Sequence, residues 1–236
     1  MSNMEAQSMD TQVFLILQTS YTLFHSNMAE HPGCYMCQVF LTDEEIGFFL
    51  GIGGSILTTS EASTGGGSEI ATEIRTRHLP NPKLKKSISS SGTSNAVSVA
   101  SGRVSFCLGL TGPCVSLDTA CSSSLVALHL AVSSLKLANC SKAATLGILV
   151  LAASLTFIFA AAGMLSQIGR CRTFDGRADG YCRGEGCCSF FFDMQKEEDP
   201  WHQIVSGSAV QQDGSSASLT APNGSSQRRL LVAVSE

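Results

Sequence analysis

Charge is scarce in this chain, and positive charge is not in excess. Of 236 residues 14% are charged, and 15 Lys and Arg stand against 19 Asp and Glu, which gives a formal net charge of −4 at pH 7. Because binding to a phosphate backbone needs a surplus of positive charge, a role with nucleic acid is disfavoured. A hydrophobic share of 44% with 22 glycines favours a large buried core over a disordered chain.

A secretory signal is also lacking, because Met1–Asp10 contains no basic residue and the apolar run after it is short. The ten cysteines are therefore predicted to be reduced and mostly buried, where a thiol behaves as a small hydrophobe. Cys34 and Cys37 have metal-ligand spacing, but no second pair completes a tetrahedral site, and no metal is expected. We expect an intracellular protein, in the cytoplasm or a plastid.

The first part of the chain predicts a helix and a strand ahead of a loop. Apolar spacing over Thr11–Phe24 indicates a helix that is buried along one side, and the apolar run Ile46–Ile52 indicates a buried strand. The Gly-rich stretch 51–67 is expected to be a loop; it is not a phosphate-binding loop, since no Lys-Ser/Thr follows its glycines. The basic stretch 75–86 is interpreted as a solvated loop rather than as a contact for RNA or a membrane.

The most informative segment surrounds Cys121. Val115–Leu117 is typical of a buried strand and Leu125–Leu137 of a buried helix, so Cys121 is predicted to lie in the turn between them. A thiol at a helix N-terminus faces unpaired N–H groups and the positive end of the helix dipole, which is where a nucleophile would be placed. The alternative is a buried, inert cysteine. His129 is expected to be a core histidine rather than the catalytic partner.

A long apolar run, Leu146–Met164, leaves two readings open. Its length is sufficient for a transmembrane helix, whereas its internal glycines, and its early β-branched residues followed by alanines, favour a buried strand and then a buried helix. Further on, the Gly-rich segments are expected to be tight turns between short strands, with Arg and Glu pairing across a loop. These segments span residues 169–175, 178–186, 207–214 and 219–224.

Several of these segments resemble one family. Asp118–Ser124, preceded by Gly109–Pro113, is similar to the active-site segment of the β-ketoacyl synthase domain of type I polyketide synthases, which are thiolase-fold condensing enzymes. The resemblance continues in the family's order through residues 9–21, 102–105, 162–166, 169–175, 178–186, 207–214 and 219–224. It implies an α/β fold of the layered α/β/α/β/α thiolase type, represented mainly by its N-terminal half. Residues 1–236 are then one partial domain, the N-terminal half and the start of the C-terminal half.

The resemblance also implies a mechanism. The Cys121 thiolate accepts an acyl chain from a phosphopantetheine thioester, and the backbone N–H of Cys121 contributes to an oxyanion hole. A malonyl-type extender on acyl carrier protein then decarboxylates and attacks the Cys121 thioester in a Claisen condensation of polyketide or fatty-acid biosynthesis. Phe157 and Phe159 fall where the family lines or gates its acyl pocket, although core packing explains each equally well. The implied partners are acyl carrier protein and, in the complete domain, a second copy of the chain. No tightly bound cofactor and no membrane span are implied.

Two departures from the family pattern support an alternative. The family's histidine motifs, His-Gly-Thr-Gly-Thr and Gly-His, lie downstream of 219–224 and do not occur before Glu236, so we expect an incomplete domain that is truncated at both ends. Phe190–Phe192 stand where the family has smaller aliphatic residues, which requires repacking. The alternative function is an inactive thiolase-fold fragment that contributes only to dimerisation or to binding of acyl carrier protein.

Overall fold

The computed structural model describes residues 9–29, 45–53, 96–194, 204–218 and 221–235, and the expectations for Cys34, Cys37 and the stretches 54–67 and 75–86 lie outside them. The described helices and strands follow the chain in the order α2 (Thr11–Ala29), β1 (Ile46–Ile52), α7 (Val97–Leu108), β2 (Cys114–Leu117), the short 3-10 helix η1 (Ala120–Ser122), α8 (Ser123–Lys136), β3 (Lys142–Leu149), α9 (Ala153–Ala161), β4 (Gly186–Asp193) and α10 (Gly224–Ser235).

A four-stranded mixed sheet organises the described residues, with strand order β2-β1-β3-β4. β1 runs parallel to β2 and to β3, whereas β4 is antiparallel to β3. The carboxyl ends of the three parallel strands therefore meet at one edge of the sheet, where α/β proteins place their binding sites. The turn that carries Cys121 follows β2 at this edge.

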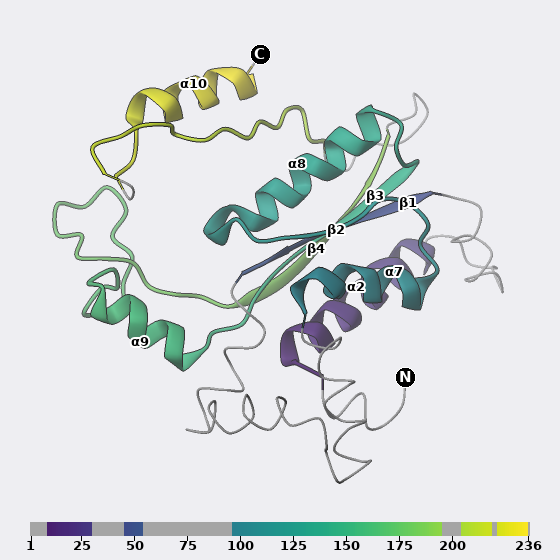
Figure 1. The fold of residues 1–236 in the computed structure, drawn as a ribbon, viewed down its shortest axis with the longest axis horizontal. Coiled ribbons are helices and arrows are strands. Elements are labelled where there is room, and N and C mark those ends of the chain that lie inside the picture. The colour runs from purple at the N-terminus through teal and green to yellow at the C-terminus, as the bar shows by residue number, and fades with distance from the viewer. Residues whose placement is uncertain (1–8, 30–44, 54–95, 195–203, 219–220, 236) are drawn as a thin grey trace, which may run out of the picture.

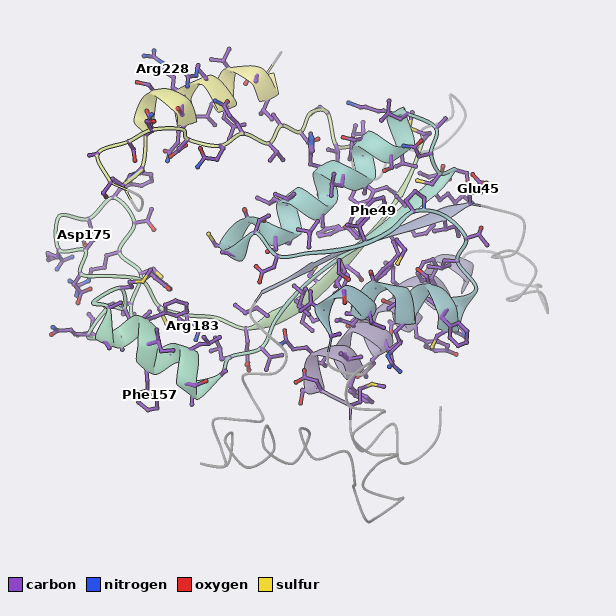
Figure 2. The ribbon with its side chains drawn as sticks, in the orientation of Figure 1. Glu45, Phe49, Phe157, Asp175, Arg183 and Arg228 are labelled. Atoms are coloured by element: carbon purple, nitrogen blue, oxygen red, sulfur yellow. The ribbon has the colours of Figure 1, made fainter. Side chains whose placement is uncertain are left out.

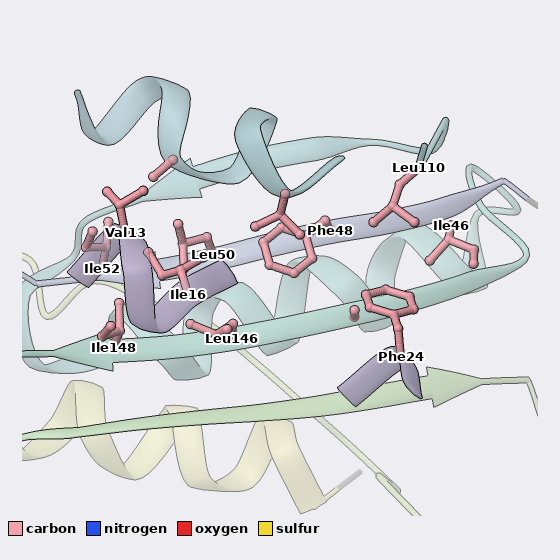
Figure 3. Packing of buried hydrophobic residues seen from close by; sticks show 13 residues of the cluster. Val13, Ile16, Phe24, Ile46, Phe48, Leu50, Ile52, Leu110, Leu146 and Ile148 are labelled. Atoms are coloured by element: carbon pink, nitrogen blue, oxygen red, sulfur yellow. The ribbon is translucent and has the colours of Figure 1, made fainter. Parts of the chain in front are cut away.

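Helices cover both faces of the sheet. Figure 1 shows α8 on one face and α2 with α7 on the other, whereas α9 and α10 lie to one side. All seven residues of β1 are buried, as expected for a parallel strand that is covered on both faces. The core on the α2 and α7 side (Figure 3) includes Val13, Ile16, Phe24, Ile46, Phe48, Leu50, Ile52, Val104, Leu110, Leu146 and Ile148.

The predicted helix at Thr11–Phe24 and the strand at Ile46–Ile52 are both confirmed, with the helix continuing to Ala29. The apolar run 146–164 forms the end of β3 and then α9, so the strand followed by a helix is confirmed. The predicted burial of the helix is wrong, because no residue of α9 is buried, whereas β3 is mostly buried. Within the described ranges, no helix is both long and apolar enough to cross a membrane. The short strands expected after residue 168 are mostly absent: in the described part of that region only β4 forms, with one isolated bridge between Leu165 and Tyr181.

The three phenylalanines of β4 are divided between the two faces of an edge strand. Phe191 packs edge-on against Phe24 of α2, with ring centroids 5.7 Å apart. Phe190 and Phe192 lie together with centroids 6.3 Å apart, and Phe190 remains half exposed. Because side chains alternate along a strand, the three rings lie on two faces of β4 and are not packed together in one dense core.

Candidate active site

Cys121 lies where the sequence predicted it, in the turn between β2 and α8. It occupies η1, a single turn of 3-10 helix, and α8 begins at Ser123, two residues before the predicted start of the helix. The residue is exposed. The prediction of a turn is therefore confirmed, and the alternative of a buried cysteine does not fit this structure.

Short polar side chains hold the backbone of this turn. The carboxylate of Asp118 accepts a hydrogen bond from the N–H of Ala120 at 2.8 Å. The hydroxyl of Ser123 accepts from the N–H of Thr119 at 2.8 Å and donates to the carbonyl of Ala120 at 2.7 Å. The Ser122 hydroxyl donates to the carbonyl of Thr119 at 2.8 Å. Such local bonds replace the backbone partners that a tight turn leaves unmade, so the side chains of Asp118, Ser122 and Ser123 hold the turn in place.

Ala120, immediately before the nucleophile candidate, has a left-handed backbone with φ of 56°. For a residue with a Cβ this conformation costs about 1–2 kcal/mol. Strain of this kind persists only where the surrounding structure enforces it, and it is concentrated at functional sites. The hydrogen bonds of Asp118 and Ser123 with the backbone of Ala120 hold it in this conformation.

The strand that leads into the turn is tied to a neighbouring helix. The Ser116 hydroxyl of β2 donates to the hydroxyl of Ser101 on α7 at 2.7 Å and accepts from the Ser101 N–H at 3.1 Å. Because Ser101 is buried, these bonds satisfy polar groups away from water and fix the position of β2 relative to α7. The serines were not recognised as site residues from the sequence, where they carry no pattern of their own.

The two predicted pocket aromatics have different surroundings on α9. Phe157 is 74% exposed, and Figure 2 shows it on the side of α9 that faces away from Arg183. Phe159 lies beneath the Arg183 guanidinium, whose Cζ is 5.0 Å from the ring centroid. The same guanidinium donates to the Thr156 hydroxyl at 2.7 Å. Arg183 therefore braces α9 around Phe159.

The expected pairing of Arg and Glu across the loop is wrong for Arg183 and Glu185. Both side chains turn to the α9 region: Arg183 bonds Thr156, and the Glu185 carboxylate accepts from the N–H of Leu151 at 3.2 Å. Leu151 stands just before α9, so the Arg-Gly-Glu segment holds this helix at its start and along its side. The sequence marked the Arg-Gly-Glu segment as notable but did not indicate that it contacts α9, because α9 is about thirty residues away.

His129 is half-buried on α8 rather than enclosed in the core, and its Nδ1 lies 3.0 Å from the hydroxyl of Ser208. The contact joins α8 to the segment 204–218, and it does not involve Cys121. The expectation that His129 is not the partner of the nucleophile agrees with this placement.

The prediction of mostly buried cysteines is wrong. Of the eight described, six are exposed, Cys140 is buried and Cys187 is partly buried. Burial raises the pKa of both the Cys140 and the Cys187 thiol. The prediction relied on the apolar character of cysteine as a residue type. Six of the described cysteines instead lie on loops, at a helix end or on the edge strands of the sheet, β2 and β4. In the described part of the chain, no three His, Cys, Asp or Glu residues are grouped so that they could hold a metal ion.

The fold is that of solved ketosynthases, which have the thiolase-like layered architecture. A ketosynthase from module 6 of the bacillaene synthase of Bacillus subtilis 168 superposes with a TM-score of 0.73 at 29% identity, over 96% of this chain and 35% of that one. The oxazolomycin ketosynthase domain OzmH KS7 of Streptomyces albus JA3453 gives a TM-score of 0.60 at 29% identity, over 83% of this chain and 30% of that one. The fold thus places the chain in the thiolase-like class to which the solved ketosynthases belong.

The family is established by sequence. The model of the family described as "Beta-ketoacyl synthase, N-terminal domain" matches residues 1–197, and the chain belongs to this family. Polyketide synthase GfsB of Streptomyces halstedii is 37% identical over 232 residues, which are 96% of this chain and 4% of that protein. The spectinabilin polyketide synthase system protein NorB of Streptomyces orinoci is also 37% identical over 232 residues, 96% of this chain and 9% of that protein. The chain therefore spans less than a tenth of these relatives and about a third of the solved ketosynthases.

Proposed function

We propose that this chain is the part of a β-ketoacyl synthase that carries the acyl-accepting nucleophile, Cys121. The observation that carries the proposal is the placement of an exposed thiol in the turn between β2 and α8, at the carboxyl edge of the parallel strands. Residues 1–236 belong to one domain, comprising its N-terminal half and the start of its C-terminal half. Similarity to GfsB over 232 residues supports this extent.

The first step is transfer of an acyl group. The Cys121 thiolate attacks the carbonyl carbon of an acyl thioester, the new C–S bond forms, and the phosphopantetheine thiolate leaves with the electron pair of the broken C–S bond. The N–H of Cys121 and the positive end of the α8 dipole stabilise the negative charge on the carbonyl oxygen during the attack.

The second step is decarboxylative condensation. A malonyl-type extender on acyl carrier protein loses CO₂, its carbanion attacks the carbonyl of the acyl-Cys121 thioester, and the Cys121 thiolate departs to leave a 3-ketoacyl chain. Both substrates arrive on phosphopantetheine, and the proposed reaction requires no tightly bound cofactor. The partners are acyl carrier protein inside the cell and a second copy of the chain. The polyketide synthase names of the relatives support the polyketide over the fatty-acid pathway.

Phe157 and Phe159 contribute to the binding of the acyl chain. The contact with Arg183 supports Phe159 as a fixed part of the acyl-binding surface, because a ring that packs against a guanidinium keeps its orientation. The exposure of Phe157 supports an apolar surface that is available to a ligand or a partner.

Acylation of the isolated chain tests the first step. The chain is incubated with an acyl thioester of N-acetylcysteamine, and the adduct is located by peptide mass spectrometry. We expect the acyl group on Cys121, and a loss of at least roughly tenfold in Cys121→Ser, because a serine hydroxyl lacks the thiolate's nucleophilicity.

Cys107→Ser is the matched control, since Cys107 is also exposed but lies on α7 away from the turn. This variant should acylate as the unaltered chain does. Acylation spread evenly over the exposed cysteines would contradict the proposal and would leave the alternative of an inactive fragment that only dimerises or binds acyl carrier protein.

A further inference from the structure

Two cysteines outside the nucleophile turn are brought into contact by one loop. The backbone N–H of Cys182 donates to the Sγ of Cys171 at 3.1 Å. The same sulfur lies 3.7 Å from the carbonyl oxygen of Cys182. The Cys171 side chain therefore lies against the backbone of Cys182, although ten residues separate them in the sequence.

The loop that brings these residues together is held at its base. The Tyr181 N–H donates to the carbonyl of Met164 at 3.1 Å, and the Ser166 N–H donates to the carbonyl of Tyr181 at 3.0 Å. The Asp179 carboxylate accepts from the Ser166 hydroxyl at 2.7 Å. Figure 2 shows Asp175 at the outer end of this loop and Arg183 beside α9. Cys182 directly follows the anchored Tyr181, so the approach of the two cysteines is set by the architecture of the loop.

The spacing suits a disulfide. The Cα of Cys182 can be no further from the Cys171 sulfur than about 4.6 Å, the hydrogen-bond length extended by one N–Cα bond. A disulfide joins residues whose Cα atoms are about 4.4–6.8 Å apart, and the contact of the Cys171 sulfur with the Cys182 backbone brings the pair close to that range. The Cys182 thiol lies 3.5 Å from the Arg183 carbonyl, so it must rotate towards Cys171 for the bond to form. Both residues are exposed, so an oxidant in solution can reach them.

We propose that Cys171 and Cys182 are a redox pair that forms a reversible disulfide in the presence of a peroxide. One thiol loses its proton, the thiolate attacks hydrogen peroxide and the O–O bond breaks, which gives a sulfenic acid and a hydroxide that takes up the proton to become water. The second thiol loses its proton, its thiolate attacks the sulfenic sulfur and the S–O bond breaks; the departing hydroxide takes up that proton and leaves as the second water. Two thiols are oxidised and one peroxide is reduced to two waters, and a dithiol reductant reverses the bond.

The position of the pair gives the bond a consequence. Cys182 directly precedes Arg183, the residue that bonds Thr156 and covers Phe159. A covalent link from Cys171 to Cys182 ties the backbone in front of Arg183 to the opposite arm of the loop. Oxidation therefore restricts the motion of the segment that braces α9.

Peptide mapping of the full chain tests the pair. The chain is treated with hydrogen peroxide, free thiols are blocked with N-ethylmaleimide, and trypsin digestion follows without reductant. Cleavage after arginine places Cys171 in the dipeptide Cys171–Arg172 and Cys182 in the peptide Ala178–Arg183. We expect these two peptides to be joined, and to separate when dithiothreitol is added.

Two variants sharpen the test. Cys171→Ser should abolish the joined peptide, whereas Cys107→Ser, which removes an exposed thiol of α7, should leave its yield unchanged. Because attack within a fixed pair is favoured over attack between molecules, the joined peptide should form roughly tenfold faster than any other crosslink. Full labelling of Cys171 and Cys182 by N-ethylmaleimide after oxidation, or joining of Cys182 to several cysteines without preference, would overturn the proposal.

Discussion

Gly51 of β1 and Gly147 of β3 lie opposite each other in the parallel register, and α8 begins directly against both. A Cβ on Gly51 would lie 2.5 Å from the carbonyl carbon of Ser123, and a Cβ on Gly147 would lie 2.6 Å from the Cβ of Ser124. The first turn of α8 therefore packs directly on Gly51 and Gly147, which carry no side chain and are called the glycine floor below. The turn that carries Cys121 can approach the sheet only because both positions are empty.

Gly51→Ala should displace the start of α8, because the new methyl group meets backbone atoms that cannot rotate away. We expect a loss of about 1–3 kcal/mol in the free energy of unfolding, measured by urea denaturation, together with reduced acylation of Cys121.

Gly102→Ala is the control for this change. Gly102 is inside α7, and no atom lies within 4 Å of the position its Cβ would take. Alanine is the better helix former, so this variant should be more stable by about 0.5–1 kcal/mol. Equal effects of the two substitutions would show that α8 does not depend on the glycine floor.

Ala120→Gly should relieve the left-handed strain before Cys121. Glycine adopts φ of 56° without a steric cost, so the variant should gain up to about 1 kcal/mol in thermal or urea unfolding, less the entropy that glycine adds to the unfolded chain. Ala152→Gly is a suitable control, since Ala152 has an extended backbone and should only lose stability. A clear destabilisation by Ala120→Gly would mean that the turn holds no strain at this residue.

Arg183→Lys should loosen α9 while keeping the charge. Lysine lacks the planar fork that both bonds Thr156 and covers Phe159, and the loss is worth about 1–2 kcal/mol. We expect faster hydrogen exchange of the α9 amides, measured by mass spectrometry. Arg177→Lys alters an exposed arginine that pairs with Asp175 and should leave the exchange of α9 unchanged. Unchanged exchange in Arg183→Lys would show that the guanidinium does not brace the helix.

Acid should weaken the base of the loop at 164–181 through Asp179. The hydrogen bond from the Ser166 hydroxyl, followed by smaller contributions that include the Gln167 N–H, lowers the pKa of this carboxyl below the ordinary value of an aspartate. A group whose pKa is lowered by folding contributes stability above its unfolded pKa and loses it as the pH falls through the folded pKa. Thermal unfolding followed from about pH 5 down to pH 2 should therefore show a steeper loss in the unaltered chain than in Asp179→Asn. Parallel curves would contradict the assignment.

The sequence by itself determined the local elements and the place of the candidate nucleophile. Apolar spacing predicted α2, an apolar run predicted β1, and residue composition predicted the succession of β3 and α9, because these patterns are local properties of helices and strands. The turn around Cys121 depends on residues close to it in the sequence, since the side chains of Asp118, Ser122 and Ser123 bond the neighbouring backbone.

Only the tertiary structure decided which distant segments meet. The register of β1 with β3 placed Gly51 opposite Gly147, and the path of the loop turned Arg183 towards Phe159 and Cys182 towards Cys171. Residue type misplaced the cysteines, since burial depends on which surfaces the sheet and helices cover and not on the hydropathy of one side chain. Contacts between residues far apart in the chain follow from strand pairing and packing, which no local spacing encodes.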